Sequence, residues 1–223
     1  MIRIFENSRE LARGAAEHFV ALGPFTVALS GGSTPKLLYQ LLADQFHTQV
    51  PWSRTQFFWS DERHVPPDHP DSNYRMAYEA LLSRVPVQDN NVHRIHSENP
   101  SAEEAADEYE KEIVPRLDLI LLGLGTDGHT ASIFPGSDVL HETKRLIAAP
   151  WVEKLNTYRI TMTLPMLNNG ASVLFLVSGK EKAEIVKEVL EGPKKYPAQF
   201  VQPTNGELIW MLDKDAASNL SHG

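Results

Sequence analysis

The chain has 223 residues, 42% of them hydrophobic, which is enough for one large α/β domain with a buried core. Its formal net charge of −8 argues against a nucleic-acid surface, and the lack of cysteine excludes disulfides, thiolate catalysis and cysteine metal sites. The chain has no apolar run long enough to span a membrane, and its N-terminus lacks the apolar core of a signal peptide, so we expect no membrane partner and a cytoplasmic location.

The first half of the chain alternates helical and strand-like patterns. Asn7 and Glu10 have the spacing of a capping box, as do Ser101 and Glu104, and each pair precedes an apolar helical face. In chain order we predict a helix at residues 7–22, a strand at 25–29, a helix at 36–44, a strand at 56–60, a long polar loop at 61–72, a helix at 73–84, a helix at 102–113 and a strand at 119–122.

The second half continues this alternation with one interruption. We predict β-like runs at residues 146–152 and 158–163, a helical turn at 165–168, a strand at 172–178, a helix at 180–191 and a strand at 207–212. No linker divides the chain, so residues 1–223 are interpreted as one domain, with residues 137–158 as a candidate small subdomain. The expected fold is a Rossmann-like, doubly wound and mostly parallel sheet with helices on both faces and a small appended β-containing region.

The stretch from Asp118 to Gly136 is the centre of the functional prediction. Leu119 to Leu122 lack polar alternation, which is typical of a central parallel strand, and a glycine turn follows at the end where ligands bind in such sheets. Residues 123–128 match the dinucleotide fingerprint G-x-G-x-x-G. However, Pro135 arrives too soon for the long helix of that motif, and the next strand does not end in an acidic residue, so we expect no nucleotide cofactor.

The same turn carries a candidate general base. Histidine transfers protons near neutral pH, and a nearby carboxylate can fix its tautomer, which makes His129 and Asp127 candidate catalytic residues. The alternative is that His129 caps a short helix or fills a polar pocket. Its position in a glycine turn at a strand end favours catalysis.

A second glycine turn is a candidate phosphate site. Ser30, Gly31, Gly32, Ser33 and Thr34 lie between a strand and a helix, where backbone amides and hydroxyls can converge on an anion. The alternative is an ordinary turn in which Thr34 caps the helix. The turn is not a Walker loop, because the Gly-Lys-Ser/Thr ending is missing.

Isolated charges near strand ends complete the candidate site. Arg63 can bind a phosphate or carboxylate with two hydrogen bonds, and Asp61 can orient a sugar hydroxyl or a proton-bearing group, although both could belong to a solvated charge run. Arg159 and Lys180 are single cations beside strand ends, and Lys180 opposes the dipole of the helix it begins, which indicates a ligand.

We expect no metal site. His93 and His96 have a His-x-x-His spacing, and His64 and His69 share a loop, but no third ligand is spaced to complete either set. We interpret these four as surface histidines.

Taken together, these motifs resemble the glucosamine-6-phosphate isomerase/6-phosphogluconolactonase family over nearly the whole chain. The resemblance rests on the segments Ala-Leu-Ser-Gly-Gly-Ser-Thr-Pro at 28–35, Trp-Ser-Asp-Glu-Arg-His-Val at 59–65, Ser-Asn-Tyr at 72–74, Gly-Leu-Gly-Thr-Asp-Gly-His-Thr-Ala-Ser-Ile-Phe-Pro at 123–135, Tyr-Arg-Ile-Thr at 158–161 and Ser-Gly-Lys at 178–180. It implies a Rossmann-like sheet with a smaller appended region, which agrees with the fold expected from the pattern.

The resemblance also implies residue roles. His129 corresponds to the catalytic histidine, Asp61 and Asp127 to acidic positions of the site, and the turn at 30–34, with Arg63, Arg159 and Lys180, to positions that bind a 6-phosphate. The implied reaction is the hydrolysis of 6-phospho-D-glucono-1,5-lactone, a small-molecule substrate, by a monomer without cofactor or metal, as in the oxidative pentose phosphate pathway.

Two alternatives remain open. One is a deaminase or isomerase acting on glucosamine 6-phosphate. That branch of the family carries an Asn-Glu-Pro-Gly element after its histidine, whereas Ile133-Phe134-Pro135-Gly136 stands here, and this difference favours the lactonase. The other is a non-catalytic sensor of sugar phosphates on the same scaffold, because fold does not fix function.

Overall fold

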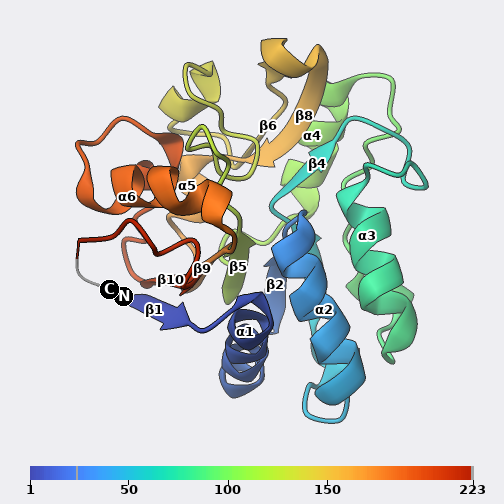
Figure 1. The fold of residues 1–223 in the computed structure, drawn as a ribbon. Coiled ribbons are helices and arrows are strands. Elements are labelled where there is room, and N and C mark those ends of the chain that lie inside the picture. Colours follow the sequence, from blue (N-terminus) through green and yellow to red (C-terminus); the bar gives the residue numbers. More distant parts are fainter. Residues whose placement is uncertain (24, 222–223) are drawn as a thin grey trace.

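The computed structural model describes residues 1–23 and 25–221, and it contains a large parallel sheet, a small antiparallel sheet and surrounding helices (Figure 1). The large sheet has the strand order β1-β10-β9-β5-β2-β3, and every neighbouring pair in it is parallel. Its strands are β1 (Ile2–Phe5), β2 (Thr26–Leu29), β3 (Gln56–Trp59), β5 (Leu119–Leu122), β9 (Ser172–Val177) and β10 (Glu207–Asp213). The mostly parallel α/β fold predicted from the sequence is therefore confirmed.

The predicted helices form, and local capping accounts for where several begin. They are α1 (Ser8–Leu22), α2 (Ser33–Gln45), α3 (Asn73–Ala80), α4 (Ala102–Glu112), α5 (Leu164–Leu167) and α6 (Ala183–Glu191). The Asn7 side chain accepts hydrogen bonds from the amides of Arg9 and Glu10, and the Ser101 hydroxyl accepts one from Glu104. These bonds satisfy amides that a helix leaves unpaired in its first turn.

Helices cover both faces of the sheet, as two neighbouring residues of β3 demonstrate. The Phe57 ring stacks on Trp52, which in turn contacts Phe19 of α1. The Phe58 ring stacks on His93, whose Nδ1 bonds to Glu112 at the end of α4. Because successive side chains of a strand point to opposite faces, α1 and α4 lie on opposite sides of the sheet. His93 is thus packed into the fold rather than free on the surface.

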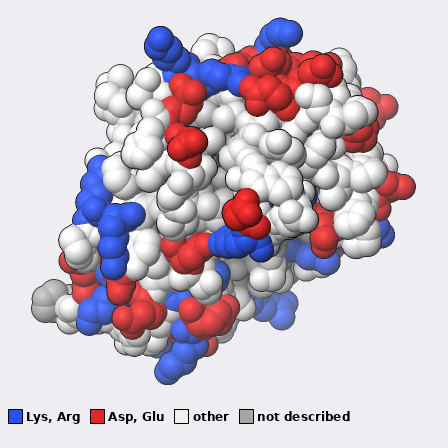
Figure 2. Space-filling view, turned by 90° about the horizontal axis from the view of Figure 1, so that it is seen from above, with Lys and Arg blue, Asp and Glu red and all other residues white. Residues whose placement is uncertain are grey.

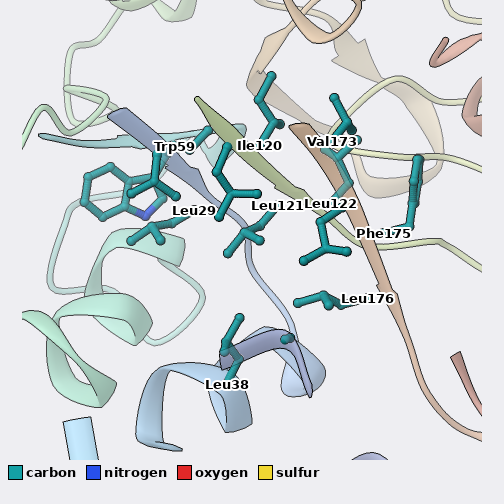
Figure 3. Close-up of a cluster of buried hydrophobic side chains, with 14 of the residues drawn as sticks. Leu29, Leu38, Trp59, Ile120, Leu121, Leu122, Val173, Phe175 and Leu176 are labelled. Carbon is teal, nitrogen blue, oxygen red and sulfur yellow. The ribbon is translucent and has the colours of Figure 1, made fainter. Parts of the chain in front are cut away.

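The core lies around the central strands. All four residues of β5 are buried, as predicted from the absence of polar alternation. Figure 3 shows Leu121 and Leu122 beside Leu29 of β2 and Phe175 of β9, with Leu38 of α2 below them. This packing makes β5 a rigid base for the loop that follows it.

Three strand assignments from the sequence were incomplete. Residues 2–5 form the edge strand β1, which was not predicted, and both Ile2 and Ile4 in it are exposed. Residues 61–63, predicted as loop, form β4 (Asp61–Arg63). The single run predicted at 146–152 is two strands, β6 (Ile147–Ala148) and β7 (Trp151–Val152), divided at Pro150, which has no N–H for a ladder.

The small sheet joins distant parts of the chain. β8 (Thr157–Met162) pairs antiparallel with β4, β6 and β7, so residues 137–158 are tied to a strand from much earlier in the sequence. Arg145 fastens the segment before β6 to α4 through three carboxylates, those of Glu103, Asp107 and Glu110. The assignment of the whole chain to one domain stays a prediction. In the described part of the chain, no helix is both long and apolar enough to cross a membrane.

Candidate active site

A cleft of about 500 Å³ lies beyond the carboxyl ends of β2, β3, β5 and β9. The loops after β2 and β5 border it, and these strands adjoin the point where the strand order reverses, which is where doubly wound sheets bind ligands. A volume of this size suits a small metabolite. Its wall contains Ser30, Gly31, Gly32, Ser33, Thr34, Pro35, Asp61, Arg63, Asn73, Gly123, Leu124, Gly125, His129, Ala131, Ser132, Phe134, Lys154, Leu155, Arg159, Leu176, Val177, Ser178, Glu181 and Lys182.

The cleft is locally basic although the chain is acidic. Four cationic side chains line it, against only the two carboxylates Asp61 and Glu181; the cations are Arg63, Lys154, Arg159 and Lys182. On the face shown in Figure 2, basic and acidic side chains are interspersed without a broad basic area. A short-range field of this kind favours a small anionic ligand.

His129 and Asp127 form a hydrogen-bonded pair at the edge of the cleft. The His129 Nδ1 lies 2.5 Å from Asp127 Oδ1, and the His129 amide donates to the same oxygen at 3.2 Å. Because an ionised carboxylate can only accept, Nδ1 carries the proton in the neutral ring and Nε2 carries the lone pair. The His129 ring is 29% exposed and lines the cleft, so this lone pair is available to a ligand.

Glycine at position 125 makes room for this pair. A Cβ atom there would lie 1.9 Å from His129 Nδ1 and 2.8 Å from Asp127 Oδ1, well inside contact distance. The imidazole also packs against Phe134, with 4.3 Å between ring centroids. Close contacts with Gly125 and Phe134 therefore restrict the orientation of the imidazole.

Asp127 is held in its charged form by two partners. Partial burial alone would raise the pKa of Asp127, but hydrogen bonds from Lys154 and His129 outweigh this effect and hold the pKa below its usual value. Lys154 comes from the segment between β7 and β8 and was not singled out from the sequence. The carboxylate therefore stays ionised and can keep His129 in one tautomer.

The turn at residues 30–34 borders the cleft at the start of α2. The Ser30 hydroxyl is buried, lines the cleft and has no hydrogen-bond partner among the described residues. Gly32 occupies the N-cap position of α2 without a side-chain cap, so the alternative in which Thr34 caps the helix is wrong. Uncapped amides and an unpartnered hydroxyl are what a bound anion would satisfy.

Tyr39 of α2 holds the backbone of this turn. Its hydroxyl accepts from the Ser30 amide and donates to the Ser30 carbonyl, both at 2.9 Å, in a fully buried position. The Ser30 amide is thus already paired, and Ser30 presents its hydroxyl to the cleft.

We expect Tyr39→Phe to lower the free energy of unfolding by about 1–3 kcal/mol, because it leaves two buried backbone groups of Ser30 unpaired. Urea titration measures this change. Tyr78→Phe is the matched control, since Tyr78 is 47% exposed and should shift stability far less. Equal stability of the two variants would contradict a role for the Tyr39 hydroxyl in holding the turn.

Asp61 is a buried residue whose position is fixed by hydrogen bonds from two side chains. Ser132 Oγ donates to its Oδ2 at 2.6 Å, and Asn73 Nδ2 donates to its carbonyl at 2.9 Å and lies 3.4 Å from Oδ1. Gly31 makes room for this amide, because a Cβ there would lie 1.9 Å from Asn73 Oδ1. A glycine at position 31 therefore allows Asn73 to pack between Asp61 and the turn at residues 30–34.

Arg63 and Arg159 are neighbours on two adjacent strands of the small sheet. They are direct register partners of β4 and β8, and both line the cleft. Burial lowers the pKa of Arg159, and the positive charge of Arg63 lowers it further. Like charges directly opposite each other destabilise a sheet, and an anion bound between them would relieve this repulsion.

The structure does not bring Lys180 into the cleft. Lys180 is exposed at the start of a short 3-10 segment, whereas Lys182 lines the cleft and donates from Nζ to the Leu124 carbonyl at 2.8 Å. After the turn at Gly179, Lys180 lies at the surface, whereas the Lys182 side chain reaches back toward the sheet. The role of Lys180 in binding phosphate stays a prediction, and Lys182 is the lysine of this segment that lines the cleft.

Several cleft residues were missed from the sequence. Lys154 lay in a segment without clear periodicity, and Ser132 and Asn73 appeared only as parts of motifs. Nothing local distinguishes them from surface polar residues. In the described residues, no cluster of three or more histidine, aspartate or glutamate side chains is arranged to hold a metal ion.

Sequence comparison identifies relatives over most of the chain. The profile described as "Glucosamine-6-phosphate isomerases/6-phosphogluconolactonase" matches residues 6–210. A protein named 6-phosphogluconolactonase from Synechocystis sp. is 44% identical over 89% of this chain and 85% of its own length.

Solved structures agree in fold. The structure of 6-phosphogluconolactonase from Trypanosoma brucei superposes with a TM-score of 0.88 and 32% identity, covering 99% of this chain and 98% of that one. A monomeric glucosamine-6-phosphate deaminase superposes with a TM-score of 0.87, covering 98% and 99%, but at 20% identity this likeness shows the fold alone. The match of the profile and the identity to these relatives establish that the chain belongs to the glucosamine-6-phosphate isomerase/6-phosphogluconolactonase family.

Proposed function

We propose that this chain hydrolyses 6-phospho-D-glucono-1,5-lactone to 6-phosphogluconate, with His129 as the general base. The observation that carries the proposal is that the free Nε2 edge of His129 and the paired guanidinium groups of Arg63 and Arg159 line the same cleft. A proton acceptor and a dianion site in one small cleft suit a phosphorylated substrate that reacts at its other end. The relatives named above as lactonases support this substrate.

In the proposed reaction, Nε2 of His129 removes a proton from water as its oxygen attacks C1 of the lactone. The carbonyl π electrons move onto oxygen to give a tetrahedral oxyanion, which backbone amides of a glycine loop stabilise. The carbonyl then re-forms, the bond from C1 to the ring oxygen breaks, and the imidazolium returns the proton to that oxygen. Asp127 keeps the ring in the reactive tautomer throughout.

The phosphate is held at the other end of the cleft. Arg63, Arg159 and Lys182 supply the positive charge, and the turn at residues 30–34 supplies hydroxyls and amides. Asp61, fixed by Ser132 and Asn73, orients a sugar hydroxyl. All these groups come from one chain, which supports our proposal that the monomer is active.

The residues after His129 bear on the deaminase alternative. Ile133 is fully buried and Phe134 packs on the imidazole, so the segment that carries a glutamate in the deaminase branch contributes an apolar wall here. A coupled assay on freshly prepared lactone, run beside ammonia release from glucosamine 6-phosphate, tests the assignment. Ammonia release without lactone hydrolysis would support the deaminase, and tight sugar-phosphate binding without either reaction would support a sensor.

We expect Arg159→Ala to raise KM by about tenfold to a hundredfold with little change in kcat, because it removes a charge-assisted phosphate contact that is the same in the ground and transition states. Inorganic phosphate should also raise the Tm of the wild type more than that of the variant. Arg116→Ala is the control, since Arg116 is an exposed arginine whose guanidinium donates to the Asn205 carbonyl outside the cleft. An unchanged KM for Arg159→Ala would contradict this phosphate site.

A further inference from the structure

Lys154 connects the small sheet to the pair of His129 and Asp127. It lies in the 3-10 turn Glu153–Leu155 between β7 and β8, and its Nζ hydrogen-bonds Asp127 Oδ2. The same Nζ lies 4.4 Å from the centroid of the Phe134 ring, which in turn packs on His129. Lys154 therefore contacts both groups that hold the imidazole.

The Asp127 carboxylate accepts hydrogen bonds from two partners, one on each oxygen. Oδ1 accepts from His129, and Oδ2 accepts from Lys154. An unpaired carboxylate beside a histidine stabilises the imidazolium, and a protonated ring cannot act as a base. A lysine that neutralises part of the carboxylate charge, and that places its own positive charge near the ring, has the opposite effect.

We propose that Lys154 is a positioning residue that tunes Asp127, so that His129 is oriented by the carboxylate and yet stays unprotonated at the pH of catalysis. The proposal rests on the function proposed above, in which His129 is the base. In this proposal the small sheet contributes to catalysis, because the turn between β7 and β8 places Lys154 beside the loop after β5.

Other charges near His129 stay the same when Lys154 is replaced. They come from each element around the cleft: Asp61 and Arg63 on β4, Arg159 on β8, Glu181 and Lys182 after β9, and Tyr196, which packs on Gly128 and bonds to Glu188. A difference between the wild type and a Lys154 variant therefore reports the contribution of Lys154 itself.

The test is the pH dependence of kcat/KM for the wild type, Lys154→Met and Lys154→Arg. With Lys154→Met, we expect the midpoint of the acidic limb to move to higher pH by about half a unit or more, with near-wild-type activity at high pH. Lys154→Arg, which keeps the charge, should restore the wild-type profile. A uniform loss of activity at every pH, or an unchanged profile, would overturn the proposal, since a purely structural role predicts one or the other.

Lys194→Met is the matched control. Lys194 Nζ also lies over an aromatic ring, 4.3 Å from the centroid of Phe200, but it does not line the cleft. Its replacement should leave the pH profile unchanged. Because Lys154 is 51% exposed, its replacement is not expected to prevent folding, and Lys154→Gln gives a second neutral variant. The ion pair is also partly screened, so 1 M salt should reduce the difference between wild type and Lys154→Met.

A second readout does not depend on turnover. NMR titration of the His129 ring in the ligand-free protein, assigned by comparison with His129→Gln, should show that Lys154→Met loses the ring proton at higher pH than the wild type. If the wild type hydrolysed no lactone, the proposed function would fail while this titration still decided the role of Lys154. Equal midpoints in the two proteins would refute that role even in an active lactonase.

Discussion

Replacing His129 with alanine is expected to lower kcat for lactone hydrolysis by about a hundredfold to ten-thousandfold, with KM changed only a few-fold. The reason is that the variant loses the only lone pair in the His129–Asp127 pair that faces the cleft, while the cations that would bind the phosphate stay in place. Initial rates of 6-phosphogluconate formation measure the effect. The spontaneous hydrolysis of the lactone must be subtracted from each rate.

His96→Ala is the control for this variant. The His96 side chain is 53% exposed, is not among the residues that line the cleft and lies 3.4 Å from Glu98, so its loss should leave kcat unchanged. A His129→Ala protein that is folded and retains nearly full turnover would exclude His129 as the general base. Preserved binding of inorganic phosphate would show that the phosphate site of that variant is intact.

Gly125→Ala is expected to lower kcat by about a hundredfold or more, because a displacement of about 1 Å in a catalytic group is enough for a loss of this size. The new methyl group would lie 1.9 Å from His129 Nδ1, so the imidazole must move away from Asp127. The backbone of Gly125 is not in the left-handed region, and alanine is therefore tolerated by the main chain. The effect should fall on the imidazole rather than on the fold.

Gly123→Ala is the matched control in the same loop. A Cβ at this position meets no atom within 4 Å, and its backbone also lacks a positive φ. Since Gly123 lines the cleft, this variant can affect KM, but it should keep the hydrogen bond between His129 and Asp127 and most of kcat. The His129 ring signals in NMR should change in Gly125→Ala and not in Gly123→Ala. Similar kcat values for both variants would contradict the proposed constraint on the imidazole.

The residues that the sequence located correctly are those whose signal is local. The run from Leu119 to Leu122 predicted a buried central strand, and its four side chains are buried. Asp127 and His129 are two residues apart, so one turn brings them together without help from the rest of the fold. The N-caps Asn7 and Ser101 are equally local, and both accept hydrogen bonds from first-turn amides, which is the N-cap half of the predicted capping boxes.

The structure differs from the prediction where a contact with a distant part of the chain overrides the local sequence pattern. Residues 61–63 have a loop-like composition, yet they form β4 because β8 provides an edge almost a hundred residues later. Lys180, predicted from its position at a helix start, lies exposed after the Gly179 turn, and Lys182 lines the cleft. The periodicity of a sequence predicts neither which residues of two strands pair nor the direction that the chain takes after a turn.

The sequence by itself determined the parallel α/β class and the family resemblance, because each rests on the order of local patterns along the chain. It also determined the two glycine turns and the histidine with its carboxylate, because these depend on residues close together. Only the tertiary structure decided that Arg63 stands opposite Arg159, that Ser132 and Asn73 fix Asp61, and that Lys154 reaches Asp127. These contacts depend on strand register and on how separate loops meet at one end of the sheet. The way these loops come together depends on the packing of the whole core, and no short segment of the chain encodes it.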